Sequence, residues 1–371
     1  MKHALDAIDV KLLMGPGPSM VPDEVYRAIA LPTVGHLDPD FLAVMDEVKA
    51  HLQHLMNTKN RLTFPVSGTG SAGMEACFVN LVEPGDPVLI LVNGVFGKRM
   101  EDLAARLGAK VDTLDFEWGS PVEPDQVAER LGQKEYRMVA VVHAETSTGV
   151  ANPVAEIGRL VRETPALYLV DCVTSLGGLP VSMDAWFADA LYSASQKCLS
   201  CPPGLAPLSF SERAVAKLTG RKSKVPNWYL DLSMIINYWE GSRRAYHHTA
   251  PINMIYALDR ALELIFAEGT DAVFARHRDS HLKLMSGLEE LGFSPFVAPP
   301  HRLPMLNTVR CPEGVDEAKV RERLLGDYRI EIGGGLGPLA GKIWRIGLMG
   351  HTARKSNVDR FLECLRAILA A

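Results

Sequence analysis

Two side chains that could do covalent chemistry together follow short apolar runs. Asp171 ends the run ALYLVD, and Lys197 comes 26 positions later, directly after DALYSASQ. A lysine at the end of a buried strand is costly unless it is paired or can lose its charge, and a desolvated amine is the nucleophile that forms a Schiff base with an aldehyde cofactor. Pyridoxal 5'-phosphate (PLP) also needs a carboxylate that faces its pyridine nitrogen. Taken alone, Lys197 is typical of a surface lysine and Asp171 of a turn residue, but together they indicate this cofactor.

A glycine-rich stretch has the features of a phosphate site. In PVSGTGSAGMEACFVNLV, the residues Thr69, Gly70 and Ser71 come at the start of a helical pattern. Small residues at a helix start let free backbone N–H groups approach a phosphate, and the Thr and Ser hydroxyls add donors. The stretch therefore predicts phosphate binding without naming the molecule that carries the phosphate.

The same glycines also fit a dinucleotide site, which is the main alternative from another reaction class. Gly68, Gly70 and Gly73 match the pattern G-x-G-x-x-G of NAD-dependent oxidoreductases. That fingerprint requires an acidic residue at the end of the next strand to hold the ribose. Here the run VLILV ends in Asn93-Gly94, so the second anchor is absent. A non-catalytic binding module, the third hypothesis, explains the glycines but not a Lys and an Asp at successive strand ends.

Alternating strands and helices must position these residues. Short apolar runs between about residues 63 and 210 alternate with helical patterns, which is typical of a doubly wound, mostly parallel α/β sheet. The helix expected at 154–164 joins two of these strands as a βαβ unit, with Pro153 at its start and Pro165 after its end. The expected strands cover 87–92, 109–115, 138–143, 166–171 and 189–195.

A second, smaller α/β domain is predicted at the C-terminal end. After about residue 270, helices at about 271–291, 315–325 and 354–369 alternate with strands in LNTVRC, YRIEIG and KIWRIGL. A long helical stretch at about 252–267 would connect the two parts. We therefore expect an N-terminal arm over residues 1–20, a large domain over 21–268 and a small domain over 269–371.

The composition of the 371 residues is that of a globular protein and argues against several classes. A net charge of -5 without a long run of Lys and Arg disfavours a nucleic-acid partner. No stretch approaches the roughly 18 uninterrupted apolar residues of a membrane span, and the start lacks a secretory signal, so we expect a cytoplasmic protein without a membrane partner. The six scattered cysteines fit reduced thiols. No metal site is predicted, because the one pair at metal-ligand spacing, Cys198 and Cys201, has no second pair.

With these positions assembled, the sequence resembles the class V PLP-dependent aminotransferases of the alanine-glyoxylate and serine-pyruvate group. The resemblance covers nearly the whole chain, and YSASQK after LVDCVTSLGG is its most specific part. It implies the type I PLP-dependent transferase fold, with a large PLP-binding domain and a smaller C-terminal α/β domain. The other matching segments are LLMGPGPS, SGTGSAGMEA, GVFGKR, HAETSTG, NWYLDL, YHHTAP and GGGLGPLAGKIWRIGLMG.

The resemblance also implies a role for each candidate residue. Lys197 holds the cofactor and carries the proton, Asp171 pairs with the pyridine nitrogen, and Arg345 grips the substrate carboxylate. Phe96 stands where relatives commonly stack a Trp on the cofactor, and Thr146 is expected near the phenolic oxygen. The implied phosphate contacts come from Thr69, Gly70, Ser71 and Gln196, and from Tyr246 and Thr249 of the partner subunit in a homodimer.

The implied activity is transfer of an amino group from a small amino acid to a small 2-oxo acid by a ping-pong mechanism. L-alanine and glyoxylate are the expected pair, with L-serine as an alternative donor and pyruvate as an alternative acceptor. A cysteine desulfurase, a more distant alternative, would carry a stacking His and a cysteine in a mobile loop. Phe96 stands in place of the His, and Cys198 and Cys201 lie beside the lysine instead of in a distant loop.

Overall fold

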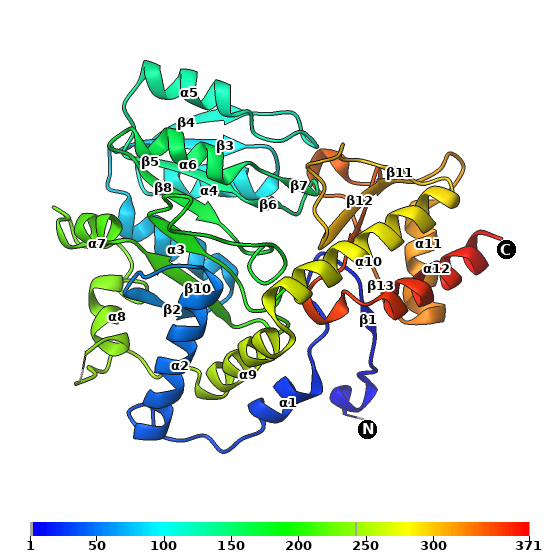
Figure 1. The fold of residues 1–371 in the computed structure, drawn as a ribbon, viewed down its shortest axis with the longest axis horizontal. Helices are drawn as coiled ribbons and strands as arrows, with labels where there is room; N and C mark the ends of the chain where they lie inside the picture. Colours follow the sequence, from blue (N-terminus) through cyan, green and yellow to red (C-terminus); the bar gives the residue numbers. More distant parts are fainter. Residues whose placement is uncertain (1–2, 242, 371) are drawn as a thin grey trace.

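The computed structural model describes residues 3–241 and 243–370, and its two main sheets lie in separate parts of the molecule (Figure 1). Over these residues the larger sheet has seven strands in the order β2-β10-β9-β8-β5-β3-β4. Strands β4, β3, β5, β8 and β9 are parallel, and β10 runs antiparallel to both of its neighbours. The predicted α/β architecture with a mostly parallel sheet is confirmed, and the reversed strand is an addition that the sequence patterns did not predict. The strands are β2 (Leu62–Ser67), β3 (Pro87–Val92), β4 (Lys110–Asp115), β5 (Met138–Val142), β8 (Leu167–Asp171), β9 (Ala190–Tyr192) and β10 (Leu205–Phe210).

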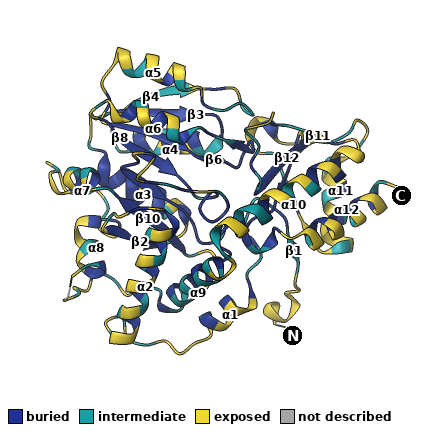
Figure 2. Cartoon of the chain, in the orientation of Figure 1, coloured by how far each residue is buried: buried dark blue, intermediate teal, exposed yellow. Residues whose placement is uncertain are grey.

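The central strands of this sheet are buried along almost their whole length. Runs such as VLILV in β3 and MVAVV in β5 carry apolar side chains on both faces, as expected for parallel strands that helices cover on both sides. The edge strand β4 differs, because it exposes Lys110 and Asp115, and charged side chains keep an edge from pairing with another chain. Figure 2 shows the contrast between the buried strands and the exposed outer faces of the helices.

Helices pack against the large sheet from the segments between its strands. Helix α3 contacts β9 and β10, α4 contacts β3 and β4, and α6 contacts β8, while α1 and α2 pack on α9. One hydrophobic core, built from residues between Val25 and Val273, fills the space between these elements. The helices are α1 (Asp23–Ile29), α2 (Pro39–Leu55), α3 (Gly70–Leu81), α4 (Val95–Arg106), α5 (Pro124–Gln133), α6 (Val154–Arg162), α7 (Glu212–Thr219), α8 (Leu232–Trp239) and α9 (Ile252–Glu268).

The C-terminal part has its own sheet and its own hydrophobic core. Strands β11 (Ser294–Pro295), β12 (Leu306–Arg310), β15 (Trp344–Gly347) and β14 (Gly333–Gly334) lie side by side in that order, with antiparallel pairing throughout. Three helices accompany them: α10 (Thr270–Glu290), α11 (Glu317–Tyr328) and α12 (Lys355–Leu369). Trp344, Phe361 and Leu365 are fully buried at the centre of this second core.

The N-terminal segment crosses from this second part to the first (Figure 1). Strand β1 (Leu12–Leu13) pairs in parallel with β13 (Ile330–Glu331), and α1 then packs on α9. The strand expected near YRIEIG is present as β13, which pairs with the N-terminal segment, whereas β14, the next strand along the chain, joins the four-stranded sheet. The domain boundaries at 20/21 and 268/269 stay predictions. Among the described residues no helix combines the length and the apolarity needed to cross a bilayer.

Candidate active site

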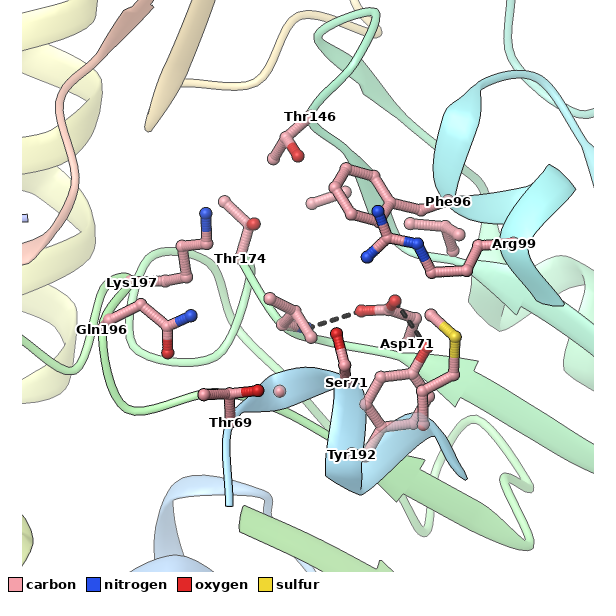
Figure 3. A pocket seen from close by; sticks show the side chains of 15 residues that line it. Thr69, Ser71, Phe96, Arg99, Thr146, Asp171, Thr174, Tyr192, Gln196 and Lys197 are labelled. Atoms are coloured by element: carbon pink, nitrogen blue, oxygen red, sulfur yellow. Dashed lines mark hydrogen bonds between the residues drawn. The ribbon is translucent and has the colours of Figure 1, made fainter. Parts of the chain in front are cut away.

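A cavity lies beyond the carboxyl ends of β5, β8 and β9, where loops of a parallel sheet form a crevice (Figure 3). Its lining includes the last residue of each of these strands, which are Val142, Asp171 and Tyr192. Eight of the eleven residues proposed from the sequence come together in this lining: Thr69, Gly70, Ser71, Phe96, Thr146, Asp171, Gln196 and Lys197.

Asp171 ends β8, where it is buried and held by two hydrogen bonds. The Tyr192 hydroxyl donates to one carboxylate oxygen at 2.6 Å, and the Val173 backbone N–H donates to the other at 2.7 Å. Burial raises the pKa of Asp171 to about 6, and the Tyr192 and Val173 hydrogen bonds oppose that rise because they stabilise the charged form. The arrangement keeps a carboxylate available at the floor of the cavity near neutral pH.

Lys197 reaches the cavity from the loop after β9, on a different side from Asp171 (Figure 3). Its amine donates to the backbone carbonyl of Pro16, in the N-terminal segment. Burial lowers the pKa of Lys197 to about 8, which places a neutral, nucleophilic amine within reach of physiological pH. A Cβ added at Gly17 would lie 2.5 Å from Nζ, so the glycine leaves the space that the lysine side chain occupies.

The start of α3 forms a cradle suited to a phosphate. Thr69 is the N-cap residue, but its side chain makes no capping hydrogen bond to the helix. Helix starts expose backbone N–H groups and carry partial positive charge, which favours an anion. Across the cradle, Oε1 of Gln196 is buried without a hydrogen-bond partner among the residues described. These features, with Asp171 and Lys197 in the same cavity, fit PLP as a group with one phosphate, one ring nitrogen and one aldehyde.

The start of α4 presents an aromatic ring and a guanidinium to the cavity. Phe96 lies in the first turn of α4, and Arg99, three positions later, lies with its guanidinium carbon 5.0 Å from the centre of the Phe96 ring (Figure 3). Arg99 lines the cavity and makes no salt bridge within the described part of the chain. Its positive charge also favours the ionised form of Asp171.

Arg345 does not line the cavity but contacts its wall. The side chain is 7% exposed on β15, with Nε donating to the carbonyl of Gly334 at 2.7 Å and Nη1 donating to the carbonyl of Thr146 at 3.4 Å. Burial lowers its pKa to about 10, against the opposing charge of Glu145. Both of these hydrogen bonds go to carbonyl groups, and among the described residues Arg345 forms no salt bridge with a carboxylate.

The last two candidates, Tyr246 and Thr249, lie outside the cavity lining of their own chain. Tyr246 is 60% exposed, and its ring centre lies 4.9 Å from that of His36. The expectation that these residues act across a subunit interface stays a prediction.

Three contributors were missed by reasoning from the sequence. Tyr192 faces Asp171 directly in the register of β9 and β8, a neighbour relation that only strand order reveals. Arg99 follows Phe96 by three residues, and this helical spacing could have been noticed from the sequence. Gly17 meets Lys197 across 180 positions of sequence, for which the GPGPS segment gave no local signal.

Comparison with known proteins decides the family. The family model described as aminotransferase class-V matches residues 13–361. The chain belongs to this family. The aminotransferase therefore uses PLP, as the sequence and the cavity both predicted.

Individual relatives cover almost the whole aminotransferase. The (S)-ureidoglycine–glyoxylate transaminase of Bacillus subtilis is 38% identical over 97% of this chain and 91% of its own length. The alanine–glyoxylate aminotransferase of Callithrix jacchus is 40% identical over 98% of this chain and 88% of its own length. Among solved structures, the alanine–glyoxylate aminotransferase from Nostoc sp. has a TM-score of 0.97 and 48% identity, covering 100% of this chain and 98% of the other.

These findings exclude the dinucleotide hypothesis for the glycine-rich stretch. Its preceding strand, β2, is an edge strand that pairs antiparallel with β10. A dinucleotide fingerprint instead follows a strand of a parallel βαβ unit. The G-x-G-x-x-G match of Gly68, Gly70 and Gly73 was therefore misleading, because small residues at a helix start occur in other folds too and say nothing of the strand that precedes them.

Proposed function

We propose that this enzyme transfers the amino group of L-alanine to glyoxylate. The observation that carries the proposal is the buried Arg345 guanidinium, which has only carbonyl partners and touches the cavity wall at Thr146. A buried cation of this kind is costly unless a ligand completes it, and a carboxylate matches its two-pronged donor geometry. Amino acids and 2-oxo acids both bring that carboxylate.

The same geometry supports a role for each residue toward the cofactor. Bound PLP supplies an aldehyde for Lys197 and a ring that withdraws electrons from the substrate carbon. Asp171 pairs with the ring nitrogen, Phe96 packs on the ring face, and Thr146 lies near the phenolic oxygen. The phosphate is held by Thr69, Gly70, Ser71 and Gln196.

Lys197 and Arg345 perform the steps that involve the substrate. Arg345 binds the carboxylate and so fixes the orientation of the α-carbon. Lys197, as a free amine with a pKa of about 8, accepts the proton from the α-carbon and returns it to the neighbouring position. Because the amino group stays on the enzyme between the departure of the first oxo acid and the arrival of the second, ping-pong kinetics follow.

A homodimer completes the site in this proposal. Tyr246 of the partner subunit and Thr249 of the partner subunit add donors to the phosphate. The support is that both residues belong to the YHHTAP segment of the family resemblance, and that Tyr246 is exposed on a single chain. A single chain would then hold the cofactor less tightly than the dimer.

Glyoxylate is favoured as acceptor because both kinds of relative carry it in their names, whereas the amino donors differ. Alanine is the donor named for the solved structure with 48% identity. Serine with pyruvate or glyoxylate is the second choice, and (S)-ureidoglycine is the donor named for the relative from Bacillus subtilis. A pocket separates donors that differ by a single hydroxyl only weakly unless it bonds to that hydroxyl.

A matrix of initial rates tests this assignment. The purified enzyme with PLP is assayed with alanine against glyoxylate, and with serine and (S)-ureidoglycine each against glyoxylate and pyruvate. The proposal expects the highest kcat/KM for alanine with glyoxylate, and parallel double-reciprocal plots as the concentration of the second substrate is varied. A higher kcat/KM for another donor would replace alanine, and intersecting lines would refute the ping-pong scheme.

A further inference from the structure

Glu145 is a carboxylate with no exposed surface, and it directly precedes the cavity residue Thr146. It lies in β6 (Ala144–Glu145), which pairs with β7 (Val150–Ala151) in a short hairpin. One carboxylate oxygen accepts hydrogen bonds from Ser147, from the backbone N–H at 3.0 Å and from the hydroxyl at 2.5 Å. Burying a carboxylate is costly unless hydrogen bonds compensate for the lost water, so the partners of Glu145 show what it connects.

The other oxygen of Glu145 holds the start of α4. The backbone N–H groups of Phe96 and Gly97 donate to it at 3.1 and 3.4 Å, and the Ser147 hydroxyl accepts from the N–H of Val95 at 2.9 Å. The first N–H groups of a helix have no partners within the helix, so a distant pair of side chains caps α4. The N-cap residue of α4 is Gly94, where an added Cβ would overlap the Glu145 carboxylate.

The hairpin that carries Glu145 also meets the substrate-binding arginine of the proposed function. The carbonyl of Thr146 accepts from Arg345, and Glu145 is the charge that opposes the lowering of the Arg345 pKa by burial. Glu145 therefore stands between two parts of the site that are far apart in sequence: Phe96 at the start of α4, and Arg345 on β15. Glu145 bonds to the start of α4 directly, whereas Arg345 is bonded through the carbonyl of the next residue, Thr146.

We propose that Glu145 is a positioning residue, which fixes the Phe96 ring and the Thr146–Arg345 contact relative to each other. The inference rests on the proposed roles of Phe96 and Arg345. A glutamine at this position keeps the shape but has only one acceptor oxygen. Its amide NH2 group must then face either the Ser147 donors or the N–H groups of α4, so one of the two connections is lost.

The test compares two variants with a matched control, with each protein assayed at about pH 8.5, above the pKa of about 7 to which burial raises Glu145. Glu145→Gln breaks one connection, and Ser147→Ala removes the hydroxyl that bonds both Glu145 and α4. Asp189→Asn is the control, because Asp189 is also a buried carboxylate, and it accepts from Tyr168, Ser211 and Arg213 outside the cavity. The measurements are thermal unfolding, the Kd for PLP, the circular dichroism of bound PLP, and KM and kcat for alanine.

The proposal expects Glu145→Gln to raise the Kd for PLP and the KM for alanine about tenfold each, and to change the circular dichroism of the bound cofactor. Ser147→Ala should show the same pattern at about threefold, and it carries the test if Glu145→Gln does not fold. Asp189→Asn should lower the unfolding temperature alone. If both variants keep a Kd for PLP and a KM for alanine within twofold of the wild-type values and lose only stability, the proposal is overturned. A wild-type enzyme that fails to capture PLP or to transfer amino groups would instead refute the proposed function.

Discussion

We predict that the hydrogen bond from Tyr192 to Asp171 controls how tightly the enzyme holds its cofactor near neutral pH. The bond is 2.6 Å long, and both partners are buried. Tyr192→Phe removes only the hydroxyl and keeps the ring that packs within the sheet. Tyr168→Phe is the matched control, because its buried hydroxyl donates to the carbonyl of Val154 at 2.9 Å, outside the cavity lining.

The size of the effect follows from the charge of the acceptor. A hydrogen bond to a charged group contributes about 1.5–3 kcal/mol, and 1.36 kcal/mol corresponds to one pH unit. Loss of the bond should therefore raise the pKa of Asp171 by about one to two pH units from its value of about 6. Asp171 is then about half to nine-tenths protonated at pH 7, and a protonated Asp171 cannot pair with a protonated ring nitrogen.

The assay is titration of PLP into the cofactor-free protein, followed by absorbance and fluorescence over a range of pH. For Tyr192→Phe we expect the Kd for PLP at pH 7 to rise about twofold to tenfold, and to recover toward the wild-type value as the pH rises and Asp171 ionises. Tyr168→Phe should lose stability but keep the wild-type Kd. If the Kd of Tyr192→Phe follows the same pH curve as the wild type, the hydroxyl does not control the charge of Asp171, and the reasoning is refuted.

Three other perturbations follow from the same site. Arg345→Lys replaces a two-pronged donor by a single ammonium, so KM for alanine should rise about tenfold or more while the Kd for PLP stays unchanged. An equal rise in both constants would contradict a role of Arg345 in carboxylate binding. Gly17→Ala adds a Cβ 2.5 Å from the Lys197 amine, at a backbone φ of 104°. The rate of PLP capture, measured by stopped flow, should therefore fall strongly. Gly15→Ala is the control, because the nearest contact of its added Cβ is 3.7 Å, and it should capture PLP at the wild-type rate. Because the folded pKa of Asp171 is raised from 3.8 to about 6, its contribution to stability is complete below about pH 3.8 and is lost as the pH rises through 6. The free energy of unfolding of cofactor-free Asp171→Asn, measured by chemical denaturation, should therefore rise relative to that of the wild type by up to about 3 kcal/mol between pH 4 and pH 7. A constant difference would show that burial does not raise the pKa of Asp171.

Local patterns predicted the central elements well, because buried parallel strands have a strong signature. The strand expected at 87–92 is β3 without change, and the helix expected at 154–164 is α6 to within two residues. Buried parallel strands such as β3 are apolar on both faces and end at turn residues, so their bounds are visible in the sequence. The reversed strand β10 (Leu205–Phe210) has the same apolar character, and strand direction leaves no mark on composition.

The site was predictable where a residue's role belongs to its own segment. Asp171 ends β8, Lys197 lies in the loop that follows β9, and Thr69 is the N-cap residue of α3. Contacts that depend on tertiary structure were not accessible in this way. Glu145 caps a helix that starts 50 positions earlier, and Pro16 accepts from a lysine 181 positions later, so only the folded chain brings these groups together.

The central claim is that Lys197 and PLP carry an amino group from alanine to glyoxylate. Absorbance spectra of the PLP-loaded enzyme, recorded after one equivalent of L-alanine and again after glyoxylate, test it most directly, with Lys197→Ala recorded alongside. The account predicts that the visible absorption of the wild type disappears with alanine and returns with glyoxylate, while Lys197→Ala does not complete this cycle. A wild-type spectrum that alanine leaves unchanged, or a Lys197→Ala variant that cycles at the wild-type rate, would contradict it.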